Sequence, residues 1–406
     1  MSHPAVMDGT SPGTPWRVAA TCARGLEGVV AAELVGLGMG PVVPGVGVVE
    51  FEADLSGVIR TNLWLRGAMR VVVKLAEGRV DGRQDLYDMA RRIPWEAWMG
   101  VDQTLAVDVA GRSPSFTNTA FAGLVVKDAV VDRLRDKVGS RPNVNRFDPD
   151  LRMHVHLGTG RAGIGVDSSG APLSHRGYRP RGGPAPLAES LAAGVLLLAG
   201  YDGTQPLLDP MCGTGTLAIE GALLATARAP GLRRSFAWER WKFLPGDLGR
   251  SLRAEAESRR KSPAWPVVGR DLDPRAVAAA TANARAAGVG EYCRFERGDV
   301  RTLPPVQPGS LIVSNPPYGH RLGDEGDLTG LYREMGRALK AGAPGSKAWL
   351  LVGDRTLGRA LGLRPQHRIE LFNGPLRCVL LGFELVRGQV PAPGFPPEVN
   401  RPSRRP

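Results

Sequence analysis

The sequence predicts an α/β protein in which a smaller α+β region precedes a doubly wound, mostly parallel sheet. Two observations support this fold class. Residues 187–390 alternate short apolar strands with helices, which is typical of parallel sheets covered by helices on both faces. Residues 16–166 begin in the order strand, helix, strand, helix, strand, which is typical of an α+β layer. The 406 residues are also too many for one hydrophobic core.

The N-terminal region contains short apolar runs separated by glycines. A strand is expected from Trp16, followed by a turn at Gly25 and a helix that ends near Gly36. The later run LRMHVHLGTGRAGIGVD predicts two strands, and His154 and His156 alternate on one face of the first. Because no further ligands lie nearby in the sequence, these histidines are interpreted as ordinary strand residues, and no metal site is predicted.

Composition shifts divide the chain. Residues 1–15 are expected to form a disordered leader, and the basic, proline-rich residues 391–406 a disordered tail. Residues 167–186 are rich in Gly, Pro and Arg and are interpreted as a linker. The sheet region 187–390 is expected to carry a helical insertion near residues 226–264. Its last two apolar runs, separated by NGPLR, predict an antiparallel hairpin at the sheet edge.

The net charge of +12 and the pI near 10.0 indicate a protein that meets polyanions. No apolar run is long enough for a transmembrane helix, and the N-terminus does not resemble a signal peptide. The four cysteines are far apart, which favours neither a zinc site nor a disulfide framework. A cytoplasmic protein with a nucleic acid partner is therefore expected, with no membrane and no metal; the oligomeric state is not predicted.

The stretch LLDPMCGTGT reads as a strand end, an acidic residue, a glycine turn and the start of a helix. Gly213 and Gly215 would let backbone N–H groups approach a ligand, and the following helix N-terminus would favour a carboxylate. The turn matches neither a Walker A loop nor the G-x-G-x-x-G dinucleotide fingerprint. Cys212 within it is expected to pack as a small residue, not to act as a nucleophile.

Acidic residues follow the next two strands. Asp271 could accept hydrogen bonds from ribose hydroxyls, and Asp299 could accept one from an adenine amino group. Either acid alone is better explained as a helix cap or turn residue. The ordered set, followed by Asn315 at the end of a fourth strand, favours S-adenosylmethionine as the ligand. The residues expected to bind this cofactor are Asp209, Cys212, Gly213, Gly215, Asp271, Asp299 and Asn315.

The DPMCGTGT turn together with Asn315-Pro-Pro-Tyr318 resembles the class I S-adenosylmethionine-dependent amino-methyltransferases. The upstream segments NTAFAGLVVKDAVVDRL, RPNV, DSSGAPLSHRGYR and APLAESLAAG resemble bacterial THUMP-domain RNA methyltransferases, most closely the 23S rRNA guanine-N2 enzymes, with the tRNA guanine-N2 enzymes as cousins. The resemblance covers roughly residues 15–390. It implies a ferredoxin-like plus THUMP RNA-binding region at 16–166 and a Rossmann-like methyltransferase domain at 187–390. The chain is expected to lack the second methyltransferase domain that some relatives carry.

The resemblance also implies how the Asn-Pro-Pro-Tyr segment acts. The Asn315 side-chain oxygen and the Pro316 carbonyl would accept the hydrogens of an exocyclic amino group, and Tyr318 would stack on the base. Pro316 and Pro317 would make this arrangement rigid. The catalytic set is therefore Asn315, Pro316, Pro317 and Tyr318. The methyl acceptor is expected to be guanine N2 in 23S rRNA; the alternatives are a tRNA guanine and an RNA-binding assembly factor without catalysis.

Basic and aromatic residues are interleaved in the linker and in the insertion, a composition that suits single-stranded RNA. The linker and insertion residues predicted to contact RNA are Arg176, Tyr178, Arg179, Arg233 and Arg234. The insertion also carries Phe236, Trp238, Trp241 and Phe243 beside Arg228, Arg240 and Lys242. Packing of these rings against the rest of the protein is an equally good interpretation.

Overall fold

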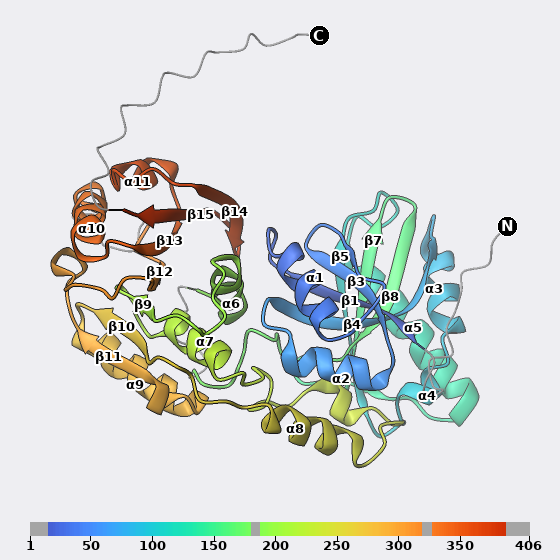
Figure 1. Cartoon of the computed structure of the whole chain (residues 1–406). Coiled ribbons are helices and arrows are strands. Elements are labelled where there is room, and N and C mark those ends of the chain that lie inside the picture. Colours follow the sequence, from blue (N-terminus) through green and yellow to red (C-terminus); the bar gives the residue numbers. More distant parts are fainter. Residues whose placement is uncertain (1–14, 180–186, 319–326, 387–406) are drawn as a thin grey trace, which may run out of the picture.

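The computed structural model describes residues 15–179, 187–318 and 327–386, which form two bodies built around two sheets (Figure 1). Residues 1–14 of the predicted leader, residues 180–186 of the predicted linker, and the predicted tail lie outside the described residues. An α/β architecture with a mostly parallel C-terminal sheet is confirmed.

The N-terminal body contains one sheet of eight strands in the order β2-β3-β1-β4-β8-β7-β5-β6. Its strands are β1 (Trp16–Cys22), β2 (Val43–Pro44), β3 (Val48–Ala53), β4 (Ala68–Arg79), β5 (Thr104–Gly111), β6 (Asn143–Val144), β7 (Leu151–Gly158) and β8 (Arg161–Asp167). Its helices are α1 (Glu27–Gly36), α2 (Leu55–Trp64), α3 (Arg83–Arg92), α4 (Trp95–Trp98) and α5 (Thr119–Val138).

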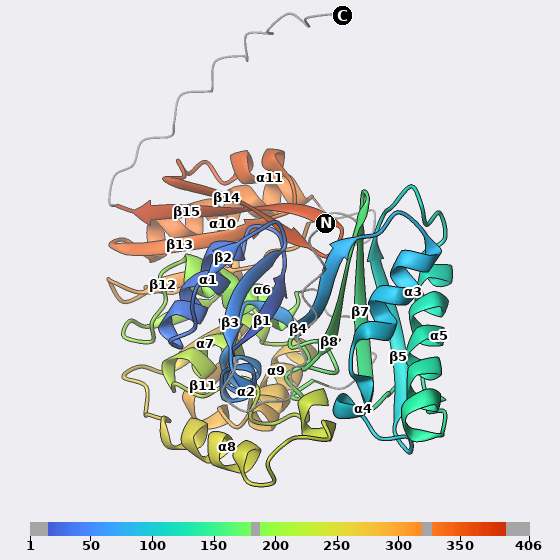
Figure 2. The same cartoon turned by 90° about the vertical axis from the view of Figure 1, so that its right-hand side faces the viewer.

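The long strand β4 holds this sheet together, because it pairs with β1 on one side and with β8 on the other. Val71, Val73 and Leu75 alternate along β4 and are buried, as expected for a strand with one face on the core. Helices α3 and α5 lie side by side against the β5–β7 part of the sheet (Figure 2). The alternating apolar residues thus produce one continuous sheet from two sequence segments.

The C-terminal sheet has seven strands in the order β11-β10-β9-β12-β13-β15-β14. Its strands are β9 (Leu207–Asp209), β10 (Val267–Asp271), β11 (Cys293–Arg297), β12 (Leu311–Ser314), β13 (Ser346–Val352), β14 (His367–Asn373) and β15 (Leu376–Leu385). The helical elements of this body are α6 (Glu189–Leu198), α7 (Thr216–Ala225), η1 (Ala237–Arg240), α8 (Leu248–Ser258), α9 (Pro274–Ala287), η2 (Gly290–Tyr292), η3 (Val300–Thr302), α10 (Leu328–Gly342) and α11 (Arg355–Ala360).

Strand β9 is the centre of this sheet, and it pairs in parallel with both β10 and β12. The strand order reverses between β9 and β12, so a crevice is expected outside their carboxyl ends. At the far edge, β14 and β15 pair antiparallel, which confirms the predicted hairpin. The Gly-rich turn after β9 and the Asn-Pro-Pro-Tyr segment after β12 therefore lie at the same edge of the sheet.

The insertion packs against the N-terminal body. Trp241 makes edge-to-face contacts with Trp16 and Trp98, with ring centroids 6.2 and 5.2 Å apart, and Phe243 joins the same cluster. Helix α8 lies beneath α2, where Arg60 and Glu255 form an ion pair (Figure 1). Aromatic packing of this kind joins the two bodies.

The burial of these rings decides between the two interpretations of the insertion. Phe236, Trp238 and Trp241 are buried. Their rings are therefore not available to stack RNA bases, which favours the packing interpretation for these three. The rings fill the space between the insertion and the rest of the protein.

No helix among the described residues is long and apolar enough to cross a membrane. Within the same residues, no group of three or more His, Cys, Asp or Glu side chains could hold a metal ion. His154 lies with its Nε2 3.3 Å from the Asp167 carboxylate, while His156 is exposed.

Candidate active site

Asp209 is the last residue of β9, and its carboxylate is buried at the centre of the site. The Ser314 hydroxyl, at the end of neighbouring β12, donates to its Oδ1 over 2.7 Å, and the Met211 N–H donates over 3.2 Å. Burial raises the pKa of Asp209 from its ordinary 3.8 to about 7, and the negative charge of Asp271 adds to this effect. Asp209 thus joins the two central strands where their order reverses.

The glycine turn is fastened to the next strand by Asp271. The Gly213 N–H donates to Asp271 Oδ2 over 2.8 Å, and the Asp273 N–H donates to Oδ1 over 2.9 Å. Gly213 and Gly215 have φ values of 53° and 87°, in the left-handed region that favours glycine. A Cβ on Gly215 would also lie 2.9 Å from Ala280. Asp271 therefore shapes the turn, while each carboxylate oxygen keeps a lone pair for a ligand hydroxyl.

Cys212 lies in the middle of this turn and is buried. Burial raises the pKa of its thiol far above the ordinary value, and the carboxylates of Asp209 and Asp271 act in the same direction. Its sulfur lies 3.1 Å from where a Cβ on Gly269 would be. A protonated, packed thiol is the expected state, in keeping with the predicted packing role.

Asp299 follows β11 and caps the short helix η3 by accepting from the Arg301 N–H over 2.9 Å. The Arg301 guanidinium also donates to its Oδ2 over 2.6 Å. These hydrogen bonds hold the pKa of Asp299 below its ordinary value. Asp299 is thus an ionised acceptor at a strand end, and its contact with an adenine amino group stays a prediction.

Asn315 follows the last residue of β12 and carries an acceptor that lacks a partner. Its Oδ1 is buried, and no hydrogen bond to it is found among the described residues. A buried acceptor without a donor is costly unless a ligand supplies one. The next turn is held from behind, because the Tyr332 hydroxyl donates to the Pro317 carbonyl over 3.2 Å. An N–H donor from a ligand would satisfy the Asn315 oxygen.

Tyr318 completes this segment and is only 5% exposed. Its ring lies against Gly353, the residue after β13, where an added Cβ would approach ring atom Cδ2 to 2.3 Å. Its hydroxyl accepts from Asn373 Nδ2 over 3.1 Å. Sequence reasoning missed Gly353 and Asn373; the signal available was a glycine directly after an apolar strand. Stacking of Tyr318 on a base stays a prediction.

Comparisons with known proteins agree with this geometry. The family model described as "RMKL-like, methyltransferase domain" matches residues 176–381, about half of the chain. This chain belongs to that family. Models described as a THUMP domain and as an RlmL ferredoxin-like domain match residues 83–167 and 17–72.

Among sequence relatives, the ribosomal RNA large subunit methyltransferase K/L of Pseudomonas putida (strain GB-1) is 38% identical over 383 residues. That match covers 90% of this chain but 52% of the relative, so the chain spans about half the length of the curated relatives it matches.

Solved structures extend over nearly the whole chain. A predicted N6-adenine-specific DNA methylase from Listeria monocytogenes is 31% identical with a TM-score of 0.83, covering 91% of this chain and 96% of its own. SMU.472, provisionally named a methyltransferase and solved in complex with SAH, is 27% identical with a TM-score of 0.84, covering 92% and 99%.

Two of the residues predicted to contact RNA lie inside the methyltransferase domain's junction with the N-terminal body. Arg176 and Tyr178 are only 3% and 4% exposed. The Arg176 guanidinium donates to the Arg66 carbonyl over 2.6 Å, and the Tyr178 hydroxyl donates to Glu220 Oε1 over 3.2 Å. The RNA-contact prediction is therefore wrong for both, because neither side chain reaches the surface.

The remaining arginines of that prediction differ in their surroundings. Arg179 donates to the Thr216 hydroxyl over 2.9 Å and so braces the start of helix α7. Arg234 donates to the carbonyls of Ser169 and Ala171, and burial lowers its pKa to about 10. Structural hydrogen bonds thus hold the half-buried Arg234, and its contact with RNA stays a prediction. Arg233 is exposed and stays a candidate.

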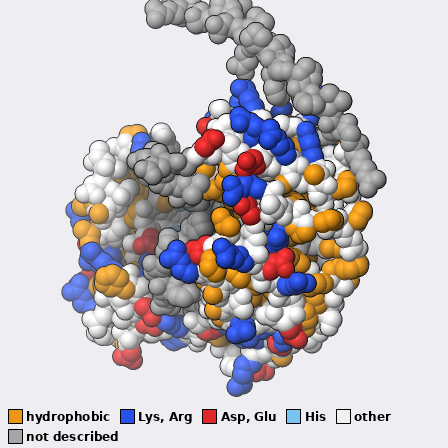
Figure 3. Space-filling view, turned by 90° about the vertical axis from the view of Figure 1, so that its left-hand side faces the viewer, with side chains coloured by type: hydrophobic (Ala, Val, Ile, Leu, Met, Phe, Trp, Pro, Cys, Tyr) orange, Lys and Arg blue, Asp and Glu red, His pale blue; other side chains and the backbone are white. Residues whose placement is uncertain are grey.

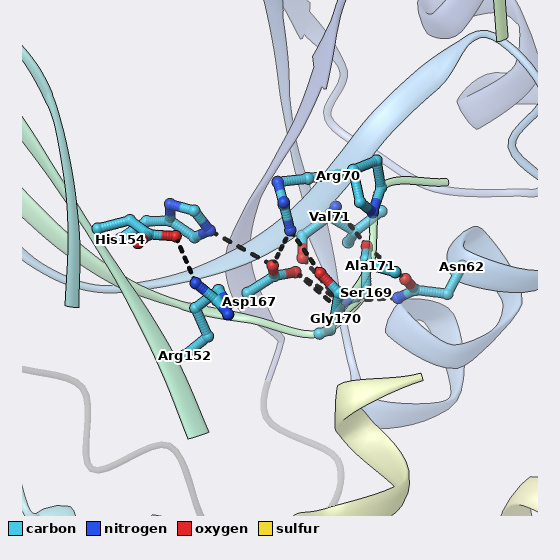
Figure 4. Close-up of polar contacts among 12 residues, drawn as sticks. Asn62, Arg70, Val71, Arg152, His154, Asp167, Ser169, Gly170 and Ala171 are labelled. Carbon is cyan, nitrogen blue, oxygen red and sulfur yellow. Dashed lines mark hydrogen bonds and ion pairs between the residues drawn. The ribbon is translucent and has the colours of Figure 1, made fainter. Parts of the chain in front are cut away.

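Buried polar contacts fix the start of the junction (Figure 4). Arg70 and His154 both converge on the carboxylate of Asp167, which is fully buried. Ser169 donates to Asn62 Oδ1 over 2.7 Å. The chain therefore leaves the N-terminal body in a defined direction. The sequence singled out His154 and the segment that begins with Asp167, but not the contact between them or their partners Arg70 and Asn62.

Proposed function

We propose that this chain transfers a methyl group from S-adenosylmethionine to the exocyclic N2 amino group of a guanine in 23S rRNA. The K/L name of the 38% identical relatives supports a ribosomal RNA substrate, and the THUMP match supports RNA binding. The Listeria relative is named for a different exocyclic amine, that of adenine in DNA. The acceptor in that name, an exocyclic amino group of a base, is of the same chemical kind as the one proposed here.

The side-chain oxygen of Asn315, unpaired among the described residues, is the observation that supports the proposal most directly. A buried amide oxygen at the carboxyl end of β12 lies at the edge of the sheet where a class I methyltransferase binds its substrate. An exocyclic amine is a poor nucleophile, because its lone pair is delocalised into the ring. By accepting an amino hydrogen, Asn315 would turn that lone pair out of conjugation, and the flanking prolines would keep the oxygen in place.

The residues at the neighbouring strand end fit the cofactor. The Asp209 carboxylate is desolvated and would be stabilised by a cationic group, such as the ammonium of a bound amino acid moiety. The first turn of α7, which follows Gly215, leaves backbone N–H groups near the same place. SAH bound to SMU.472 supports this fit. S-Adenosylmethionine would supply a methyl group that is already activated on a sulfonium.

In such a reaction the site residues would bind the cofactor and orient the acceptor amine. Asp271 and Asp299 would hold the ligand by its hydroxyl and amino groups, while Asn315 orients the acceptor amine. The described site residues offer no strongly basic side chain beside Asn315, and none is required, because the amine can lose its proton after transfer. A guanine in a paired stem would have to be flipped out to reach Asn315.

The test offers tritiated S-adenosylmethionine and purified protein to separate pools of unmodified 23S rRNA and tRNA. Labelled nucleosides are then identified by chromatography. N2-methylguanosine from 23S rRNA is the expected result. The same nucleoside from tRNA would change the substrate, a methylated adenine would change the acceptor, and no label in any pool would favour a non-catalytic RNA-binding factor.

Two variants test whether methyl transfer depends on Asn315. Asn315→Ala should abolish transfer, whereas cofactor affinity measured by calorimetry should fall only slightly. Asn143→Ala, which alters an exposed asparagine on β6, is the matched control and should retain activity. Activity retained in Asn315→Ala would refute the assigned role.

A further inference from the structure

A basic pocket lies at the amino ends of the parallel strands of the methyltransferase sheet, at the end opposite the glycine turn that follows β9 (the cofactor turn). It has a volume of about 340 Å³, within the range of small-ligand sites. Its walls come from the end of α7, the end of α8 and the turn before β11. Helix α7 has ten residues and begins at the cofactor turn, so the pocket lies about 15 Å away from that turn.

Cationic groups converge on this pocket. Its lining contains Arg228, Arg260 and Lys261 against one carboxylate, that of Glu257, which pairs with Arg260. Arg228 is partly desolvated, and burial together with the charges of Arg260 and Arg233 lowers its pKa. Gathering like charges is unfavourable without an anion to offset the repulsion.

The guanidinium groups are held in position. Arg228 Nη1 donates to the Gly288 carbonyl over 3.0 Å, and Arg233 Nη1 donates to the Ala286 carbonyl over 2.7 Å. Both carbonyls belong to the end of helix α9. One nitrogen of each guanidinium lies within 3 Å of the place where a Cβ on Gly288 would be. The two groups are therefore neighbours, and their order is established before any ligand arrives.

An aromatic ring lies at the same end of the sheet. Trp265 is 40% exposed and comes two residues before Val267, the first residue of β10. Val267 pairs with Cys293, and Tyr292, directly before it, lines the pocket. An exposed indole at the same end of the sheet as the fixed cations suits a single nucleic acid strand, in which phosphates alternate with stackable bases. A free inorganic anion would not need the ring.

We propose that this pocket binds a backbone phosphate of the substrate RNA, at a position several nucleotides away from the methylated base, with Trp265 stacking on an adjacent base. This inference rests on the proposed function for the identity of the ligand. Lys and Arg side chains are spread over the methyltransferase face among acidic ones (Figure 3). Because its guanidinium groups are fixed, the pocket would hold one RNA phosphate at a defined place and so set the register of the RNA strand on the protein. Charges spread over the surface cannot do this.

The experiment measures binding of a fluorescein-labelled single-stranded 23S rRNA fragment to the full chain at several salt concentrations. Lys261→Ala removes one exposed cation from the pocket and should lower the slope of log K against log salt by about 1. Trp265→Ala should weaken binding severalfold without changing the slope. Arg337→Ala removes an exposed arginine of helix α10, which does not line the pocket, as the matched control and should leave both unchanged.

The outcomes separate the pocket from the proposed function. An unchanged slope in Lys261→Ala overturns the pocket, whether or not RNA is methylated. Inorganic phosphate that binds the wild-type chain and not Lys261→Ala, with RNA binding equal in both, would assign the pocket to a free anion and also overturn the proposal. For a methylated RNA, Lys261→Ala should raise KM and leave kcat and cofactor affinity unchanged.

Discussion

Replacement of the buried Asp209 by Asn should stabilise the protein at pH 8 much more than at pH 5. Burial raises the pKa of this carboxyl from 3.8 to about 7, so folding favours the protonated acid. The contribution of the protonated Asp209 to the free energy of unfolding is fully present below pH 4 and is lost as the pH rises through 7. The wild-type protein loses about 4 kcal/mol of unfolding free energy in this way, of which about 3 kcal/mol is lost between pH 5 and pH 8.

Asparagine keeps the shape of Asp209 and an Oδ1 acceptor for the Ser314 hydroxyl, but it does not ionise. The stability of Asp209→Asn relative to the wild type should therefore rise by about 3 kcal/mol from pH 5 to pH 8. For a domain of this size, that is a difference in melting temperature of about 6–10 °C. Calorimetric melting of both proteins at the two pH values measures it.

Asp299→Asn is the control for this prediction. Hydrogen bonds from Arg301 lower the pKa of Asp299, so its carboxylate is ionised in both folded and unfolded states from pH 5 to pH 8. Its stabilising contribution is lost only as the pH falls through the folded-state pKa, so the effect of Asp299→Asn should be constant over that range. Parallel pH profiles for Asp209→Asn and the wild type would refute the argument.

Three further predictions concern packing and the site. Trp241→Ala should lower the free energy of unfolding, measured in urea, by about 3–5 kcal/mol, because it removes a ring from the aromatic cluster between the two bodies. A loss below about 1 kcal/mol would contradict that packing. Asp271→Ala should weaken S-adenosylmethionine binding about 10- to 100-fold in calorimetry, since it frees the Gly213 N–H; unchanged affinity would exclude this role. Gly353→Ala should displace the Tyr318 ring and lower kcat more than cofactor affinity; unaltered kcat would show that the ring is not needed.

Local signals in the sequence were sufficient for the architecture of the sheet and for the main site residues. Asp209, Asp271 and Asn315 follow successive apolar strands, and parallel strands place their carboxyl ends at one edge. The residue types and their order along the chain were therefore enough to predict that these three side chains lie at one edge of the sheet. The partner of each acid was not predictable, because Ser314 and the Gly213 N–H reach Asp209 and Asp271 across neighbouring strands.

Only the tertiary structure decided which basic and aromatic residues face solvent. Arg176, Tyr178 and Trp241 have the composition of an RNA-binding surface, yet they are buried between the two bodies. Arginine buries a long apolar stem while its guanidinium donates to carbonyls, as Arg176 does, and tryptophan buries a large ring. The same residues therefore suit an interior junction and a nucleic acid surface. Exposure depends on which surfaces meet when the bodies pack, and that is a property of distant segments, such as the contact of Trp16 with Trp241.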